Sequence, residues 1–249
     1  MKKILRSHTT LRTVLLFVLA ASLLAVGGIG TARAVPTVVS EYYSGGVEMY
    51  DIGVTLLENG NAISSRSYST NSNYVWDESY GALLGSLVPE GEDFHMGQRY
   101  DEALSVSNSG SIDEYVRVTV YKYWINKDGR KVTTLAPEMI DLHLQTGSGW
   151  VVDESASSTE RTVLYYSKVL PVGAETPAFT DTLTVDGKLP YKVHQETADN
   201  VITTTYDYDG VSFQIEVQAD AVQTHNAQAA IKSAWGRTVS VSGDSLQLG

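Results

Sequence analysis

Strict alternation of apolar and polar residues dominates the middle of the chain. Valine occupies every second position from 116 to 120, and the residues between them are Arg117 and Thr119. A period of two places the valines on one face of a strand and their neighbours on the other. Residues 104–106 alternate in the same way, and Asn-Ser-Gly-Ser at 108–111 separates the two runs with residues that favour tight turning. The pattern predicts two strands that meet at a corner, with a buried valine row.

Shorter β-prone runs recur along the rest of the chain, bounded by Gly, Asn, Asp and Pro. Their spacing of roughly 8 to 12 residues is typical of antiparallel β-sandwiches. Asp-Gly signals predict hairpin turns at 126–129, and at 207–210 between strands over 201–206 and 211–221. Residues 64–73, rich in Ser and Asn, predict a surface loop.

One helix is predicted near the C-terminus. Asn226 is a suitable N-cap, residues 227–235 carry an apolar stripe, and Gly236 is suited to the left-handed position that ends a helix. We expect this helix to cover one end of a sheet. The predicted fold class is therefore all-β, an antiparallel jelly-roll or immunoglobulin-like β-sandwich with one α-helix in the C-terminal region.

The first 34 residues have the pattern of a cleavable signal peptide. A basic start precedes an apolar run over residues 14–26, and Ala32 and Ala34 are the small residues that a signal peptidase reads. The apolar run is short for a membrane span, which needs about 20 residues. We expect cleavage to leave one secreted domain, residues 35–249, with no stable membrane span; the alternative is an uncleaved N-terminal anchor.

Charge and cysteine content narrow the possible partners. The chain has a net charge of −11, and residues 1–34 contain five of its 18 Lys and Arg and none of its 29 Asp and Glu, so residues 35–249 have a net charge of −16. Such a surface repels nucleic acid and anionic membranes. Because the chain has no cysteine, we expect neither disulfides nor thiolate chemistry.

No catalytic, cofactor-binding or metal-binding residues are predicted. The histidines beyond the signal region are isolated in the sequence: His95, His143, His194 and His225. Zinc sites need three or four converging donors, and the HExxH and GxSxG patterns are absent from the sequence. Asp207 and Asp209 are explained by ordinary turn chemistry. We therefore expect that the protein is not an enzyme and has no cofactor.

Two segments of the chain resemble the TasA/camelysin-like secreted proteins of Gram-positive bacteria. The first carries the pattern V-x-N-x-G-S-x-x-x-Y-V-R-V, here formed by Val106, Asn108, Gly110, Ser111, Tyr115, Val116, Arg117 and Val118. The second, residues 213–236, is similar to the end segment of members of that group.

The resemblance implies a jelly-roll-like sandwich, export through a signal peptidase, and assembly into extracellular fibres of a biofilm matrix. In such fibres the N-terminal strand of one subunit inserts into the next, so the expected partners are copies of this chain or related matrix subunits. We expect Val35, Val38 and Val39 to belong to that donor strand. Some members are described as metallo-endopeptidases, an activity that we rank last because the sequence has no zinc-protease motif.

A second class of function is a monomeric surface adhesin or glycan-binding module. Exposed tyrosines and residues 64–73 would then form its binding surface. Trp76 and Trp150 could contribute to such a surface, whereas Trp124 and Trp235 are expected in the core or against the helix, because large aromatic side chains dominate core burial.

Overall fold

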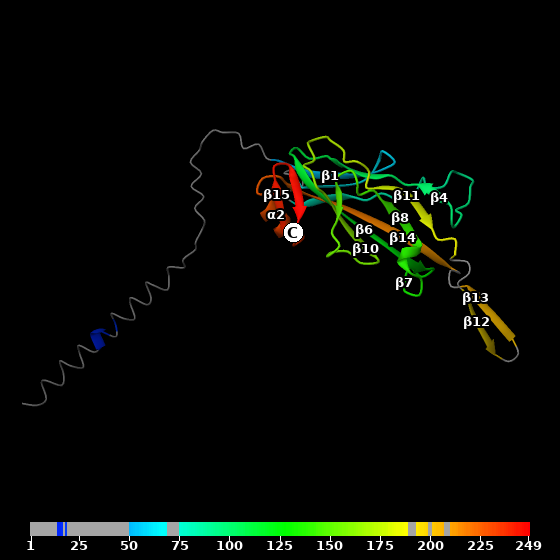
Figure 1. The fold of residues 1–249 in the computed structure, drawn as a ribbon. Coiled ribbons are helices and arrows are strands. Elements are labelled where there is room, and N and C mark those ends of the chain that lie inside the picture. Colours follow the sequence, from blue (N-terminus) through cyan, green and yellow to red (C-terminus); the bar gives the residue numbers. More distant parts are fainter. Residues whose placement is uncertain are drawn as a thin grey trace, which may run out of the picture. The chain divides into compact units, whose positions relative to one another are not determined.

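The computed structural model describes residues 14–16, 18, 50–68, 75–188, 193–198, 201–206 and 210–249 (Figure 1). The chain divides into two compact units, residues 1–47 and 48–249. In the first unit the described residues, 14–16 and 18, are helical. Among the described residues, no helix is long and apolar enough to cross a membrane.

The second unit is built almost wholly from antiparallel strands. Four of them form a sheet in the order β3-β2-β1-β5. Five others form a sheet in the order β14-β6-β10-β9, in which β7 also pairs with β6. The bounds of these strands are β1 Ile52–Glu58, β2 Asn61–Tyr68, β3 Trp76–Ser79, β5 Leu104–Asn108, β6 Glu114–Asn126, β7 Lys131–Val132, β9 Trp150–Val152, β10 Arg161–Tyr166 and β14 Val211–Gln223.

Three smaller sheets complete the unit. One has the order β4-β11-β8, and the other two are the pairs β12-β13 and β15-β16. Their bounds are β4 Arg99–Asp101, β8 Ile140–Leu144, β11 Thr180–Val185, β12 Val193–Ala198, β13 Val201–Tyr206, β15 Val239–Ser242 and β16 Ser245–Leu248. A short 3-10 helix, η1 (Pro137–Met139), precedes β8, and its proline lies in the first turn, where proline is favoured.

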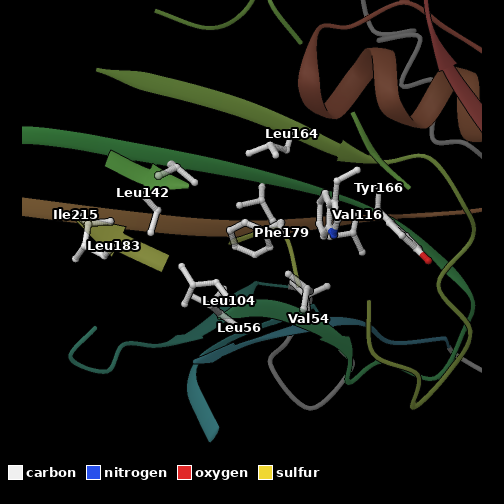
Figure 2. Close-up of a cluster of buried hydrophobic side chains, with 14 of the residues drawn as sticks. Val54, Leu56, Leu104, Val116, Leu142, Leu164, Tyr166, Phe179, Leu183 and Ile215 are labelled. Atoms are coloured by element: carbon white, nitrogen blue, oxygen red, sulfur yellow. The ribbon is translucent and has the colours of Figure 1, made fainter. Parts of the chain in front are cut away.

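The main hydrophobic core lies between the four-stranded and five-stranded sheets. In Figure 2, Val54 and Leu56 of β1 and Leu104 of β5 point toward Leu164 of β10, and the ring of Phe179 lies among them. The three predicted valines of β6 are buried in this core. Burial of such side chains contributes about 1.5–3 kcal/mol each, so this core is the main stabilising feature of the unit.

A second hydrophobic cluster lies on the other face of the five-stranded sheet. Helix α2 (Ala227–Trp235) and the β15-β16 pair cover Tyr115 and Tyr165 there, and Ile231 of the helix is completely buried. The ring of Trp235 packs edge-on against Tyr165, with centroids 5.5 Å apart. The helix therefore covers one part of this face, as its apolar stripe predicts, and leaves the remainder of β6 uncovered.

These observations confirm an antiparallel, mostly β fold with one short helix near the C-terminus. The helix ends at Gly236 in the left-handed conformation, as predicted (φ 70°). The predicted N-cap is wrong in detail: Asn226 is itself left-handed (φ 52°), and its side chain makes no capping hydrogen bond. The predicted hairpin turn at 126–129 is confirmed by the pairing of β6 with β7.

Two further predictions about local structure are wrong. Residues 64–68 belong to strand β2 and pair with β1, so the loop predicted over 64–73 does not begin at residue 64. The predicted hairpin between residues 201–206 and 211–221 does not form either. Strand β13 pairs with β12, and β14 pairs with β6 along its whole length. Long-range pairing with a central strand therefore prevails over the local Asp-Gly signal.

Candidate functional site

One edge of strand β14 is open. β14 forms the end of its sheet and pairs with β6 from Val211 to Gln223. Within the described part of the chain, its other edge makes no backbone hydrogen bond. In an antiparallel pair, alternate residues direct their N–H and C=O groups away from the partner. The outer edge of β14 therefore offers unused donors and acceptors to an additional strand.

A pocket of about 550 Å³ runs along this edge. Its lining includes six consecutive residues of β14, from Gln214 to Ala219. Successive side chains of a strand point to opposite faces of the sheet, so a pocket that contacts all six lies along the edge. Tyr121 of β6 also lines it, so the pocket extends onto the outer face of the sheet. Strands β1, β2 and β3 and residues 80–83 form the opposite wall.

The pocket combines an apolar side with a polar one. Val54 and Leu56 of β1 and Ile215 of β14 line it and also belong to the main core. Across the pocket, the hydroxyl groups of Ser65 and Ser79 lie 2.8 Å apart and join β2 to β3. This lining suits an extended segment with alternating apolar and polar side chains, because such a strand presents one kind of side chain to each face.

A cluster of charges lies at one end of the pocket. The buried Asp220, which follows Ala219 in β14, accepts hydrogen bonds from the guanidinium groups of Arg66 on β2 and Arg117 on β6. The Arg117 Nη2 to Asp220 Oδ2 distance is 2.6 Å, and the Arg66 Nε atom lies 2.7 Å from Glu78 Oε1. These ion pairs hold the four-stranded sheet against β14, so the pocket ends there.

The wall formed by residues 80–83 is held by close backbone contacts. The Glu58 carboxylate accepts a hydrogen bond from the Leu84 N–H at 2.6 Å, and Leu84 has a left-handed backbone (φ 67°). A Cβ atom at position 81 would lie 2.2 Å from the carbonyl oxygen of Ile63, so only glycine fits there. The shape of the pocket therefore depends on specific residues in this segment.

The residues of the family-like pattern have a structural role at the corner between β5 and β6. The buried Asn108 side chain accepts a hydrogen bond from the Gly110 N–H at 2.9 Å and donates to the carbonyl oxygens of Ile112 and Leu170. The Ser111 hydroxyl accepts from the Asp51 N–H at 2.7 Å. The corner thus fixes the start of β1, and it directs the chain from the four-stranded to the five-stranded sheet.

The remaining residues of the pattern are divided between the two hydrophobic clusters. Val116 and Val118 belong to the main core, whereas Tyr115 lies in the second cluster under α2. Arg117 pairs with Asp220, and its guanidinium carbon lies 5.1 Å from the ring centroid of Trp235. Of these residues, Arg117 lines one of the three pockets described in the structure.

Several predicted residues lie outside the described part of the chain. They are the cleavage residues Ala32 and Ala34 and the donor-strand residues Val35, Val38 and Val39. Within the described residues, no three His, Asp or Glu side chains converge as metal ligands. His143 contacts only one carboxylate there, with its Nδ1 atom 2.7 Å from Asp181 Oδ1, a contact that lowers the pKa of Asp181.

Two buried glutamates have carboxyl groups with a raised pKa. Burial raises the pKa of Glu114 to about 8, although the Gly53 N–H donates a hydrogen bond to Glu114 Oε1 at 2.7 Å and opposes the shift. Burial, and the neighbouring carboxyl group of Glu58, also raise the pKa of Glu102. Neither glutamate is among the lining residues of the three pockets described in the structure.

Comparisons of the chain with protein-family models, with curated proteins and with solved structures find no match.

The open edge of β14 is the feature that sequence reasoning missed. The predicted hairpin would have paired β13 with β14 and covered that edge. The alternation of Phe213, Ile215 and Val217 does predict a strand, but alternation carries no information about which neighbour pairs with it. No local signal in the sequence therefore identifies the pocket.

Proposed function

We propose that the protein is a secreted structural subunit of the cell surface or extracellular matrix, whose copies join by strand donation. The observation that carries this proposal is the unpaired edge of β14 beside the pocket. An added strand would complete the hydrogen bonds of that edge and bury apolar side chains in the same step. The fold itself would be a jelly-roll-like sandwich, an inference supported by the core that the two larger sheets share.

The dimensions of the pocket are compatible with the predicted donor. Six strand residues, Gln214 to Ala219, span about 20 Å, and the five residues 35–39 span about 17 Å when extended. Pro36 has no N–H, so a donor in this pocket would direct the proline nitrogen away from β14. Thr37 and Val39 would then direct their N–H groups toward β14, since alternate residues of a strand share one side.

Secretion is the second part of the proposal. It is supported by the signal-peptide pattern of residues 1–34, whose removal would make residues 35–39 the free N-terminal end. The expected partners are a signal peptidase, further copies of this chain and related matrix subunits. The charge of −16 on residues 35–249 disfavours nucleic acid as a ligand and favours solubility of each subunit before assembly.

The decisive experiment removes the donor and restores it as a peptide. Deletion of residues 35–43 is expected to abolish filaments seen by electron microscopy. A synthetic peptide of residues 35–43 should raise the Tm of the deletion variant, because a ligand of the folded state stabilises it, without restoring filaments. A scrambled peptide is the control. Hydrogen exchange should show slower exchange of amides between Gln214 and Ala219 when the correct peptide is bound.

Two results would contradict the proposal. Normal filaments from the deletion variant would show that residues 35–43 are not the donor. Protection by the peptide at amides outside the pocket, with no change along β14, would show that β14 is not the acceptor.

A further inference from the structure

We propose that the uncovered outer face of the five-stranded sheet binds an acidic polysaccharide, and that an arginine-lined pocket beside α2 holds a carboxylate of that polymer. The pocket has a volume of about 460 Å³. Its charged lining residues are three arginines and one aspartate, in a chain whose net charge is −11: Arg117, Arg161, Arg237 and Asp153. The pocket therefore concentrates positive charge on an acidic protein.

The three arginines differ in how far their charges are neutralised. The Arg237 Nε atom lies 2.8 Å from Asp153 Oδ2, and Arg117 pairs with Asp220. Arg161 donates its Nε–H to the carbonyl oxygen of Ala156 at 2.9 Å and has no carboxylate partner among the described residues. Its remaining N–H groups can form the two parallel hydrogen bonds by which a guanidinium holds a carboxylate.

A second pocket lies next to the arginine pocket along the sheet. This second pocket has a volume of about 560 Å³, and Tyr121 lines both. Arg117, Thr119 and Tyr121 face the same side of β6 as Tyr123 and Ile125, because side chains alternate along a strand. Together the two pockets, here called the trough, follow β6 from Arg117 to Ile125, about 27 Å at the usual rise of a strand. It is long enough for several linked sugar rings.

The groups along the trough suit a saccharide. Tyr121 and Tyr123 offer ring faces with polar tips, and Gln214 and Gln218, on the neighbouring strand β14, offer amides that both donate and accept hydrogen bonds. Sugar rings combine apolar C–H faces with hydroxyl groups, so this mixture matches them. An apolar ligand would leave the remaining N–H groups of Arg161 without partners, which costs free energy.

The distribution of charge favours a polymer with spaced carboxylates over a phosphate polymer. Glu216 lies in the middle of the trough and accepts a hydrogen bond from the Tyr123 hydroxyl. A ligand with a negative charge on every unit would meet this carboxylate and the acidic surface beyond it. A polysaccharide with separated carboxylates can place one beside Arg161 and a neutral ring beside Glu216. Arg161 does not line the pocket at the β14 edge, so its substitution tests this binding separately from strand donation, although Tyr121, Gln214, Glu216 and Gln218 line both that pocket and the trough.

The test measures binding of the full chain to a partly methyl-esterified oligogalacturonate, a saccharide whose carboxylates are separated by neutral rings, by isothermal titration calorimetry. Arg161→Gln is expected to weaken binding at least tenfold, and Arg161→Lys should weaken it less because the charge remains. Arg99→Gln is the matched control and should bind as the wild type does, because Arg99 is an exposed residue of β4 that lines neither pocket of the trough. Thermal unfolding checks that each variant is folded.

Three outcomes would overturn the proposal. The first is equal affinity of the Arg161→Gln variant and the wild type for oligogalacturonate. The second is equally strong binding of neutral dextran, which would remove the role of the carboxylate. The third is binding of polyphosphate, with the same dependence on Arg161, in the absence of oligogalacturonate binding. Conversely, the proposal is supported if raised salt weakens the binding of oligogalacturonate and if dextran does not bind.

Discussion

Strands β5 and β14 each lie at the end of a sheet, but only the outer edge of β5 is covered by another segment of the described chain. The edge of β5 is covered by residues 174–180. The N–H groups of Thr176 and Phe179 donate to the carbonyl oxygens of Val106 and Leu104 at 2.8 and 2.7 Å. In return, the Val106 and Leu104 N–H groups donate to the hydroxyl oxygens of Thr176 and Thr180, both at 3.0 Å. Every second residue of β5 therefore has a partner on this side.

The edge of β14 has no such cover within the described residues, although the strand is more than twice as long. Instead of a connecting segment, a pocket lies beside Gln214 to Ala219. Exposed edges invite pairing with other chains, and proteins usually cover or disrupt them. The difference indicates that the fold covers the edge of β5 and leaves the edge of β14 available for pairing.

The largest expected effect is at the corner that ends β5. A Cβ atom at Gly110 would lie 2.5 Å from the Asp51 carbonyl oxygen and 2.7 Å from the Gly53 nitrogen, and both are backbone atoms that cannot move independently. Gly110→Ala should lower the free energy of unfolding by ~4 kcal/mol, measured by denaturant titration. The control is Gly147→Ala, where a Cβ atom meets nothing within 4 Å. Equal stability of the two variants would contradict the close packing of the corner.

The next effect is a dependence of stability on pH, which comes from the buried Glu114 beside the same corner. Folded Glu114 keeps its proton until the pH nears its pKa of about 8, whereas in the unfolded chain the pKa is about 4.3. The contribution of protonated Glu114 to the free energy of unfolding is therefore complete below about pH 4.3. It is lost as the pH rises toward 8, at about 1.4 kcal/mol per pH unit. Burial of Glu102 acts in the same direction.

Substitution separates this contribution from other ionisable groups. Glu114→Gln keeps an oxygen that can accept the Gly53 N–H but does not titrate. It should reduce the difference in unfolding free energy between pH 5 and pH 8 by ~3 kcal/mol, measured at both pH values. Glu92→Gln, at an exposed position, is the control and should leave the difference unchanged. An unaltered pH dependence in Glu114→Gln would show that Glu114 titrates normally.

A smaller loss is expected where the edge of β5 is covered. The fully buried Thr180 hydroxyl accepts the Leu104 N–H and donates to the Glu102 carbonyl oxygen at 2.7 Å. Thr180→Val keeps the shape but leaves both backbone groups unpaired, so it should cost ~2 kcal/mol in denaturant unfolding. Thr134→Val, at an exposed bend, serves as the comparison and should be near neutral. If both variants unfold alike, the threonine hydroxyl does not protect this edge.

The smallest effect on stability is expected at the open edge. Gln214→Lys places a charge beside the pocket, as natural proteins do to protect edge strands. It should change the unfolding free energy by less than ~0.5 kcal/mol, yet prevent filament growth measured by light scattering. Ser212→Lys lies on the same strand outside the pocket and should assemble normally. Filament growth by Gln214→Lys at the wild-type rate would remove β14 as the acceptor.

The parts of the fold that sequence reasoning predicted are those with local causes. The valine row of β6 has the correct face buried because side-chain alternation alone assigns the two faces. Gly236 ends α2 because a left-handed terminal position favours glycine wherever the helix lies. The Asn-Lys-Asp-Gly turn at 126–129 reverses the chain for equally local reasons.

The parts that it missed depend on contacts between distant segments. The corner at 108–111 looked like a tight turn, but its side chains bond to Asp51 and Leu170, about 60 residues away in each direction. The alternation of side chains places Arg117 on the face opposite the valine row but identifies no partner for it. The structure shows a specific pair with Asp220 and a stacked Trp235, neither of which follows from the spacing in the sequence.

By itself, the sequence determined the antiparallel β class, the helix near the C-terminus, the face that each strand of the core buries and the acidic charge. All of these follow from the period of the side chains and from composition, which are local or additive properties. Tertiary structure alone decided which strands pair, that β13 joins β12, and that β14 keeps an open edge. Many segments that are distant in the sequence could form backbone hydrogen bonds with the same strand, and only the folded chain determines which of them pair. The open edge of β14, and therefore the candidate site, depends on that outcome.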